Sequence, residues 1–163
     1  MSHFKYLKKK LFVENISIQN IVKKNKTPFY LYSEQQIKKN YLNFTQIFRN
    51  VKPLVCFAAK ANTNLKVMKI LSKLGSGADV VSAGELLKAL KAGIKPNKIV
   101  FSGVGKTEEE LELAIRKKVL LINVESESEA ILINRIGKRI NKIISIGFRL
   151  NPNVDAKTHK KIS

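Results

Sequence analysis

The sequence predicts an α/β protein, a (β/α)8 barrel of the TIM type that is incomplete, with about five of the eight βα units. Two observations carry this prediction. Short apolar runs alternate with amphipathic stretches of helical period, and the runs end near positions 60, 82, 102, 124 and 150. The runs are apolar throughout, which is typical of strands that are covered on both faces of a parallel sheet.

The first 26 residues do not follow this rhythm. They are basic and of mixed character, with one possible strand at 10–13. The run 27–32 follows, and its opening proline and aromatic residues predict another short strand. The incomplete barrel is expected to occupy residues 27–163.

Most of the predicted helices begin with the same signal, a serine or threonine followed three residues later by Glu or Gln. At this spacing two side chains satisfy the free backbone N–H groups of a first helical turn. The pairs are Ser33 with Gln36, Ser82 with Glu85, Thr107 with Glu110 and Ser126 with Glu129. The expected helices are 33–48, 65–74, 83–92, one after Thr107 and one that ends before Gly137, and the expected strands are 53–60, 78–81, 98–101, 120–124 and 143–150.

Doubly wound sheets and (β/α)8 barrels both satisfy this pattern. A glycine-rich phosphate loop after the first strand would favour the doubly wound sheet, but residues 61–64 include no glycine. A barrel places its chemistry at the carboxyl ends of the strands, where Lys60 lies, so the barrel is favoured. Part of a barrel exposes strand edges, and we expect it to aggregate rather than function alone.

Lys60 ends the first apolar run and is the candidate catalytic residue. Within a strand it shares a face with Cys56 and Ala58, while Phe57 points the other way. Burial is expected here, and it favours the neutral, nucleophilic amine. Such an amine can form an imine with a carbonyl compound such as pyridoxal phosphate, and the small Ala58 leaves room for a ring. The alternative is a lysine whose flexible stem carries its charge into solvent.

The composition indicates a cytoplasmic protein with no membrane partner. Hydrophobic residues make up 44% of the 163, enough for a core, and no apolar stretch is long enough to span a bilayer. Cys56 is the only cysteine, so a disulfide within the chain is impossible, which fits a reducing compartment. We interpret Cys56 as a small buried residue of the core.

The net charge of +19 invites a nucleic-acid interpretation. The lysines are scattered along the chain, however, with no aromatic RNA-binding motif, zinc-ligand spacing or arginine-rich arm. We therefore expect no nucleic-acid partner. A basic nucleic-acid-binding module remains the alternative from another class, and it predicts retention on heparin with a steep salt dependence.

Four segments resemble one group of enzymes. Residues 57–62, Phe-Ala-Ala-Lys-Ala-Asn, resemble the lysine strand of the fold-type III pyridoxal-phosphate enzymes, the alanine-racemase-like barrels. Residues 77–85 resemble their second strand. Residues 27–32 and 149–159 are similar to segments of the diaminopimelate decarboxylases within that group. The four segments occur in the family's order.

This resemblance implies a homodimeric, two-domain enzyme with pyridoxal 5'-phosphate as its cofactor and a small amino acid as its substrate. Residues 1–26 would contribute to a β-domain, which accounts for their separate character. The implied reaction is decarboxylation of meso-2,6-diaminopimelate to L-lysine and carbon dioxide, and an ornithine or arginine decarboxylase of the same fold is the nearest alternative. The family's phosphate loop and catalytic cysteine have no match here, so residues 1–163 alone are expected to be inactive.

The resemblance also assigns site residues. Lys60 would bind the cofactor covalently, Asp79 matches an aspartate near it, and Glu85 matches a glutamate of the same site. Arg149 matches an arginine at the end of the fifth strand, where a fixed cation influences the cofactor's charge. The simpler interpretation of Asp79 is an aspartate that is hydrogen-bonded at the start of a strand, and that of Glu85 is a helix cap. His159 matches a loop position and not the family's ring-packing histidine.

Overall fold

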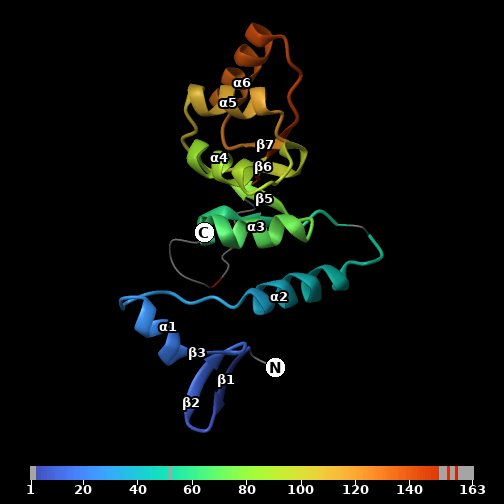
Figure 1. Ribbon diagram of the computed structural model, residues 1–163. Coiled ribbons are helices and arrows are strands. Elements are labelled where there is room, and N and C mark those ends of the chain that lie inside the picture. Colours follow the sequence, from blue (N-terminus) through green and yellow to red (C-terminus); the bar gives the residue numbers. More distant parts are fainter. Residues whose placement is uncertain (1–2, 52, 151–153, 155–156, 158–163) are drawn as a thin grey trace.

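The computed structural model describes residues 3–51, 53–150, 154 and 157. Its main feature is a parallel sheet whose five strands stand in sequence order (Figure 1). A barrel is built by this sequential addition, whereas a doubly wound sheet reverses its order partway. The predicted incomplete barrel is therefore confirmed. The strands are β4 (Cys56–Ala58), β5 (Gly77–Val80), β6 (Ile99–Phe101), β7 (Leu121–Val124) and β8 (Ile146–Phe148).

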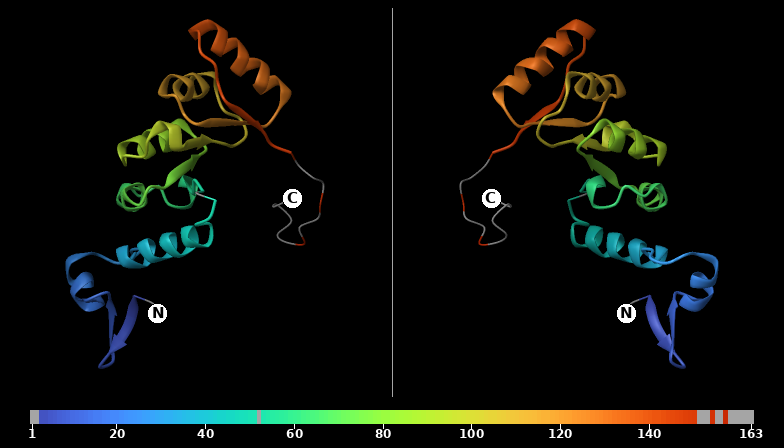
Figure 2. Two further views of the ribbon diagram at one scale, coloured as in Figure 1. Left: turned by 90° about the vertical axis from the view of Figure 1, so that its right-hand side faces the viewer. Right: turned by 90° about the vertical axis from the view of Figure 1, so that its left-hand side faces the viewer.

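A helix follows each of the first four strands of this sheet and leads to the next strand. The helices cover the outer side of the curved sheet (Figure 2). They are α3 (Leu65–Lys73), α4 (Ala83–Lys91), α5 (Glu108–Lys117) and α6 (Glu127–Ile140), and a short 3-10 turn, η2 (Pro96–Lys98), precedes β6.

The core lies between the sheet and these helices. Ile99 and Phe101 of β6 are fully buried, and they belong to one cluster with apolar residues of the helices. Burying one such side chain contributes about 1.5–3 kcal/mol, so this layer holds the βα units together. Other fully buried members are Met68, Leu86, Leu111, Ile122 and Ile136.

The two edge strands are shorter than predicted. The run 53–60 contributes three strand residues, and the chain then forms the 3-10 turn η1 (Ala59–Ala61). The run 143–150 likewise narrows to β8. Each edge strand has a ladder partner on one side only among the described residues. Several apolar residues of these runs that lie outside the ladders are exposed, among them Leu54, Ile143 and Leu150, so the apolar pattern alone does not fix where a hydrogen-bonded ladder stops.

Helix α6 does not end before Gly137, as predicted, but continues to Ile140. Asn141 ends it in the left-handed conformation that often follows a helix. Gly137 is buried, and a methyl group on it would lie 2.6 Å from Ile144 Cδ1. The glycine therefore permits close packing of the returning chain on the helix, a tertiary role that the sequence pattern does not reveal.

The first residues form a separate antiparallel sheet of β1 (Phe4–Leu7), β2 (Lys10–Val13) and β3 (Ile16–Ser17), followed by helix α1 (Ile18–Lys24). Strand β2 confirms the strand predicted at 10–13. This sheet lies at the opposite end of the molecule from α6 (Figure 1).

The strand predicted at 27–32 is wrong, because these residues form neither strand nor helix. Neither sheet pairs with this segment, and Tyr30 is 90% exposed. Residues that favour strands form one only where a neighbouring backbone is available. Helix α2 (Glu34–Ile47) then begins after Ser33, as predicted.

The capping pairs locate the helix starts correctly. In every pair the hydroxyl accepts a hydrogen bond from the backbone N–H of the Glu or Gln. The reciprocal bond to the capping residue forms at α5, through Glu110. At α4 and α6, Glu85 and Glu129 accept instead from the residue before the cap, Val81 and Glu125 respectively. None of the helices in the described ranges has the length and hydropathy that a bilayer crossing needs.

Candidate active site

The carboxyl ends of the five strands surround a cavity of about 340 Å³. Lys60 reaches it from the turn after β4, Asp79 from β5, and Arg149 from just after β8. Residues far apart in sequence meet here because the carboxyl ends of parallel strands share one edge of the sheet. The lining also includes Val81, Ser102, Gly103, Asn123, Glu125 and Phe148.

Lys60 lies at the predicted strand end, but the prediction that it is buried is wrong. The residue is exposed, and in the described part of the chain its ammonium makes no hydrogen bond or ion pair. The reason is local: the strand stops at Ala58, and β4 has no neighbour on its outer edge among the described residues. The structure therefore presents a lysine side chain beside the cavity that has no partner among the described residues.

Three hydrogen-bonded side chains cross the cavity from strand to strand. Ser102 Oγ donates to Asp79 Oδ1 over 2.5 Å, and Asn123 Nδ2 donates to Ser102 Oγ over 2.9 Å. An amide N–H can only donate, so the Ser102 hydroxyl uses its proton on the Asp79 carboxylate. The chain thereby fixes the orientation of that carboxylate.

A second carboxylate belongs to Glu125, which follows β7 and is 12% exposed. Its Oε1 accepts a hydrogen bond from Gly103 N over 3.1 Å, and its Oε2 pairs with an Arg149 guanidinium nitrogen at 3.4 Å. Glu125 therefore connects the loop after β6 to the cation at the mouth of the cavity.

Two predicted site residues do not line this cavity. Ala58 pairs with Asp79 in the ladder and lines the apolar cavity on the helix side of β4. Glu85 is partly buried, and its Oε2 accepts a hydrogen bond from Val81 N over 2.9 Å. This bond supports the capping interpretation of Glu85, and contact of either residue with a cofactor stays a prediction.

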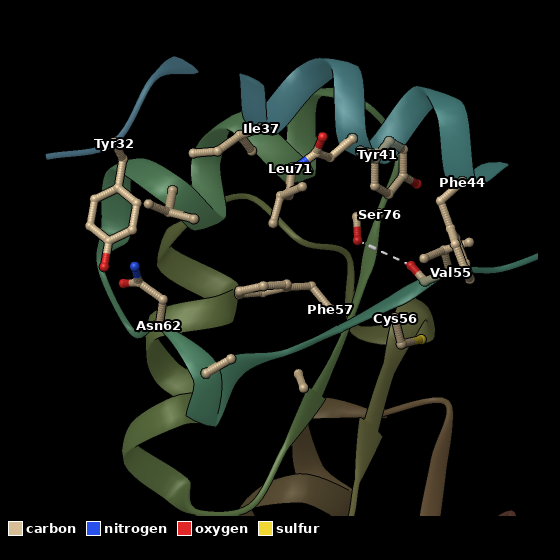
Figure 3. A pocket seen from close by; sticks show the side chains of 14 residues that line it. Tyr32, Ile37, Tyr41, Phe44, Val55, Cys56, Phe57, Asn62, Leu71 and Ser76 are labelled. Atoms are coloured by element: carbon tan, nitrogen blue, oxygen red, sulfur yellow. Dashed lines mark hydrogen bonds between the residues drawn. The ribbon is translucent and has the colours of Figure 1, made fainter. Parts of the chain in front are cut away.

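The apolar cavity has a volume of about 470 Å³ and lies between β4 and helices α2 and α3 (Figure 3). Phe57 points into it, and Ala58, which the strand alternation predicts on the opposite face, lines the same cavity. Cys56 also lines it and is partly buried. Burial raises the pKa of the Cys56 thiol, and the nearby Asp79 charge raises it further. Because a thiol with a raised pKa is a poor nucleophile at neutral pH, this cysteine is suited to packing.

Sequence reasoning missed three polar side chains of the strand-end cavity: Ser102, Asn123 and Glu125. Each one lies within one residue of the end of a predicted strand, so the rule that singled out Lys60 applies to them as well. Their types gave no separate signal, because Ser, Asn and Glu are common where a strand leads into a capped helix. His159 lies outside the described residues.

The site combines a lysine amino group, two carboxylates and a guanidinium around one small cavity. An amine can bond covalently to an aldehyde, and a guanidinium suits an anionic group such as phosphate or carboxylate. Over the ranges that the structure describes, no three potential metal ligands gather. The arrangement therefore fits a small anionic carbonyl compound, of which pyridoxal phosphate is one.

Comparisons with known proteins agree with this chemistry. The pyridoxal binding domain of the pyridoxal-dependent decarboxylases matches residues 34–163. The chain is 52% identical to diaminopimelate decarboxylase of Helicobacter pylori strain J99 over 138 residues, 85% of this chain and 34% of that protein. It is 42% identical to diaminopimelate decarboxylase of Aquifex aeolicus over 161 residues, 99% of this chain and 38% of that protein.

A solved structure, diaminopimelate decarboxylase from Helicobacter pylori complexed with L-lysine, superposes with a TM-score of 0.87 at 48% identity, over 90% of this chain and 37% of that one. The chain thus spans little more than a third of the length of the curated relatives it matches. Because the family's cofactor-binding domain matches most of the sequence, the chain belongs to the pyridoxal-dependent decarboxylases.

Proposed function

We propose that this chain is the N-terminal part of a pyridoxal 5'-phosphate-dependent carboxy-lyase that converts meso-2,6-diaminopimelate into L-lysine and carbon dioxide. The observation that carries the proposal is the position of Lys60. Its amino group lies at the carboxyl end of a barrel strand and shares one cavity with Asp79 and Arg149. The similarity to diaminopimelate decarboxylases supports the choice of substrate.

The residues of the cavity have separate roles in this proposal. Pyridoxal phosphate, when bound, supplies the electron sink that loss of a carboxylate from an amino acid requires. Lys60 would hold the cofactor covalently, Asp79 would present an oriented carboxylate, and Arg149 would supply a fixed positive charge. Glu85 is assigned to the same site by the family resemblance, and Ala58 by its small size next to Lys60 in the apolar run.

The proposal extends to the organisation of the enzyme. Residues 1–26 would contribute to a β-domain, and their separate antiparallel sheet supports this assignment. The active form would be a cytoplasmic homodimer: the family resemblance supports the homodimer, and the single cysteine fits a reducing compartment. The reaction needs neither a nucleic acid nor a membrane.

The test uses the whole protein, purified with pyridoxal phosphate. After borohydride reduction, peptide mass spectrometry is expected to find a phosphopyridoxyl group on Lys60. The Lys60→Ala variant is expected to lose the adduct and to lower kcat by a factor on the order of 10³ or more. Lys66→Ala is the matched control, because it removes an exposed lysine from the next helix. An adduct on another lysine would refute the site.

Substrate choice is measured separately, as carbon dioxide released from meso-2,6-diaminopimelate, ornithine and arginine. A preference for meso-2,6-diaminopimelate is expected. A preference for ornithine or arginine, together with an adduct on Lys60, would keep the catalytic site and replace the proposed substrate with the alternative.

A further inference from the structure

Lys106 is a buried lysine in the loop after β6, and the proposed reaction does not use it. Its side chain is 1% exposed, although the residue next to it, Gly105, lies in open space. A buried ammonium is strongly destabilising unless it is paired and hydrogen-bonded. The partners of Lys106 therefore indicate what the loop is built to hold.

Lys106 has two partners. Its Nζ donates to the carbonyl oxygen of Gly103 over 2.5 Å and pairs with Glu129 Oε1 at 2.8 Å. Glu129 is itself 10% exposed, and its other oxygen accepts a hydrogen bond from Glu125 N over 2.8 Å. The buried charge thus fixes one loop carbonyl and, through Glu129, the backbone of Glu125.

These contacts close into a ring. Glu125 Oε1 accepts from Gly103 N, so Gly103 is held at its carbonyl by Lys106 and at its N–H by Glu125. The remaining Glu125 oxygen, Oε2, pairs with Arg149. Both Gly103 and Glu125 line the strand-end cavity, whereas Lys106 and Glu129 lie behind it.

The junction between β5 and α4 shows that helix capping alone does not require the lysine. There Glu85 accepts from Val81 N over 2.9 Å, in the same relation as Glu129 to Glu125 N. Glu85 has no cationic partner among the described residues. At the junction between β7 and α6, Lys106 is therefore present in addition to the cap, and it also binds the Gly103 carbonyl.

We propose that Lys106 and Glu129 are positioning residues for the active site: they fix the Gly103 loop and the Glu125 carboxylate, and through Glu125 they place the Arg149 guanidinium. The placement of Arg149 matters only if the cofactor binds, so that claim rests on the proposed function. The fixing of Gly103 and Glu125 is independent of it, because it occurs in the protein without cofactor.

The first test measures hydrogen–deuterium exchange in the whole, cofactor-free protein. Lys106→Met is expected to speed exchange of the Gly103 and Glu125 amides by about tenfold or more, since both depend on the ring. The Val81 amide, held by Glu85, serves as an internal reference and is expected to keep its rate. Lys117→Met, at an exposed lysine of α5, is the control variant. Unchanged exchange at Gly103 and Glu125 would overturn the proposal.

Lys106→Met leaves the Glu129 carboxylate buried and unpaired, which destabilises the fold, so Lys106→Met/Glu129→Gln is made in parallel. This double variant removes both buried charges and keeps a side-chain amide oxygen that can accept a hydrogen bond from Glu125 N. It is expected to restore protection of the Glu125 amide but not of the Gly103 amide. Equal protection of both amides would overturn the role of Lys106.

The second test is a double-mutant cycle on the affinity for pyridoxal phosphate. Lys106→Met is expected to weaken binding about tenfold when Arg149 is present and less than about twofold in an Arg149→Met background, because Lys106 acts through Arg149. Equal losses in both backgrounds would indicate general destabilisation and refute the link. A protein with the expected exchange pattern that binds no cofactor would refute the proposed function and leave the ring assignment standing.

Discussion

The polar residues at the strand ends owe their orientation to one another. Asp79 is fixed by Ser102, and Ser102 is fixed by Asn123, across three adjacent strands. None of the three is unusual for its position in the sequence. The barrel order of the strands turns them into a connected group, because it places residues about 20 positions apart side by side.

Replacing Ser102 tests this group. Ser102→Ala removes the only hydroxyl between Asp79 and Asn123 in the described site, and a hydrogen bond of this kind contributes about 0.5–1.5 kcal/mol net. We expect binding of pyridoxal phosphate to the whole protein to weaken roughly three- to tenfold, measured by absorbance titration. Ser128→Ala, at an exposed serine of α6, is the control. Equal affinity of the two variants would show that Asp79 needs no orientation.

Glu14 predicts a pH dependence of stability. Hydrogen bonds from Gln35 N and Ser33 Oγ, at the start of α2, lower the pKa of Glu14 below its ordinary value of 4.5. Because the folded-state pKa is the lower one, this contribution is complete above 4.5 and is lost as the pH falls through the folded-state pKa.

We therefore expect Glu14→Gln to lower the Tm by roughly 1–3 °C at pH 7 and by less at pH 3, followed by circular dichroism. A loss of Tm in Glu14→Gln that grows toward low pH would contradict the stabilising role of the Glu14 carboxylate.

At the scale of secondary structure, the sequence predicts where elements begin better than where they end. Helix starts follow from local capping chemistry, and Ser82 and Ser126 show the predicted bonds. Ends depend on partners that are distant in sequence: Gly137 sits within a helix because Ile144 packs against it. The ring around Lys106 escapes prediction for the same reason, since its Lys106–Glu129 ion pair and its Gly103–Glu125 hydrogen bond join the loop after β6 to residues that follow β7.

Two glycines give opposite predictions for the same substitution. A methyl group on Gly77 of β5 would lie 2.3 Å from the Lys98 carbonyl oxygen and 2.8 Å from Cys56 Sγ, so Gly77→Ala is expected to destabilise the protein by about 2–4 kcal/mol. Gly84, in the first turn of α4, has nothing nearer than 3.9 Å, so Gly84→Ala is expected to stabilise by up to about 1 kcal/mol. Urea unfolding measures both changes in the free energy of unfolding. If the two changes had the same sign, this packing of β5 against its neighbours would be contradicted.

At the scale of the whole molecule, an open sheet coexists with a large positive charge. Strands β4 and β8 are the edges of the described sheet, and Phe148 and Leu150 near one edge are 70% and 85% exposed. Unpaired edges favour association with other chains. The net charge of +19 opposes that association by repulsion.

Residues 1–163 expressed alone are therefore expected to associate when salt screens this repulsion. The Debye length falls from about 30 Å at 0.01 M salt to about 8 Å at 0.15 M, which removes most of the barrier between neighbouring molecules. Light scattering should report small species at the lower concentration and growing assemblies at the higher one. Phe148→Lys, which places a charge on the β8 edge, is expected to suppress the growth. Tyr30→Lys, at a residue that is more exposed than Phe148 but lies outside both sheets, is not expected to do so. Assemblies that dissolve as salt rises would instead have charge attraction as their cause, and the exposed edge would not be the surface that drives them.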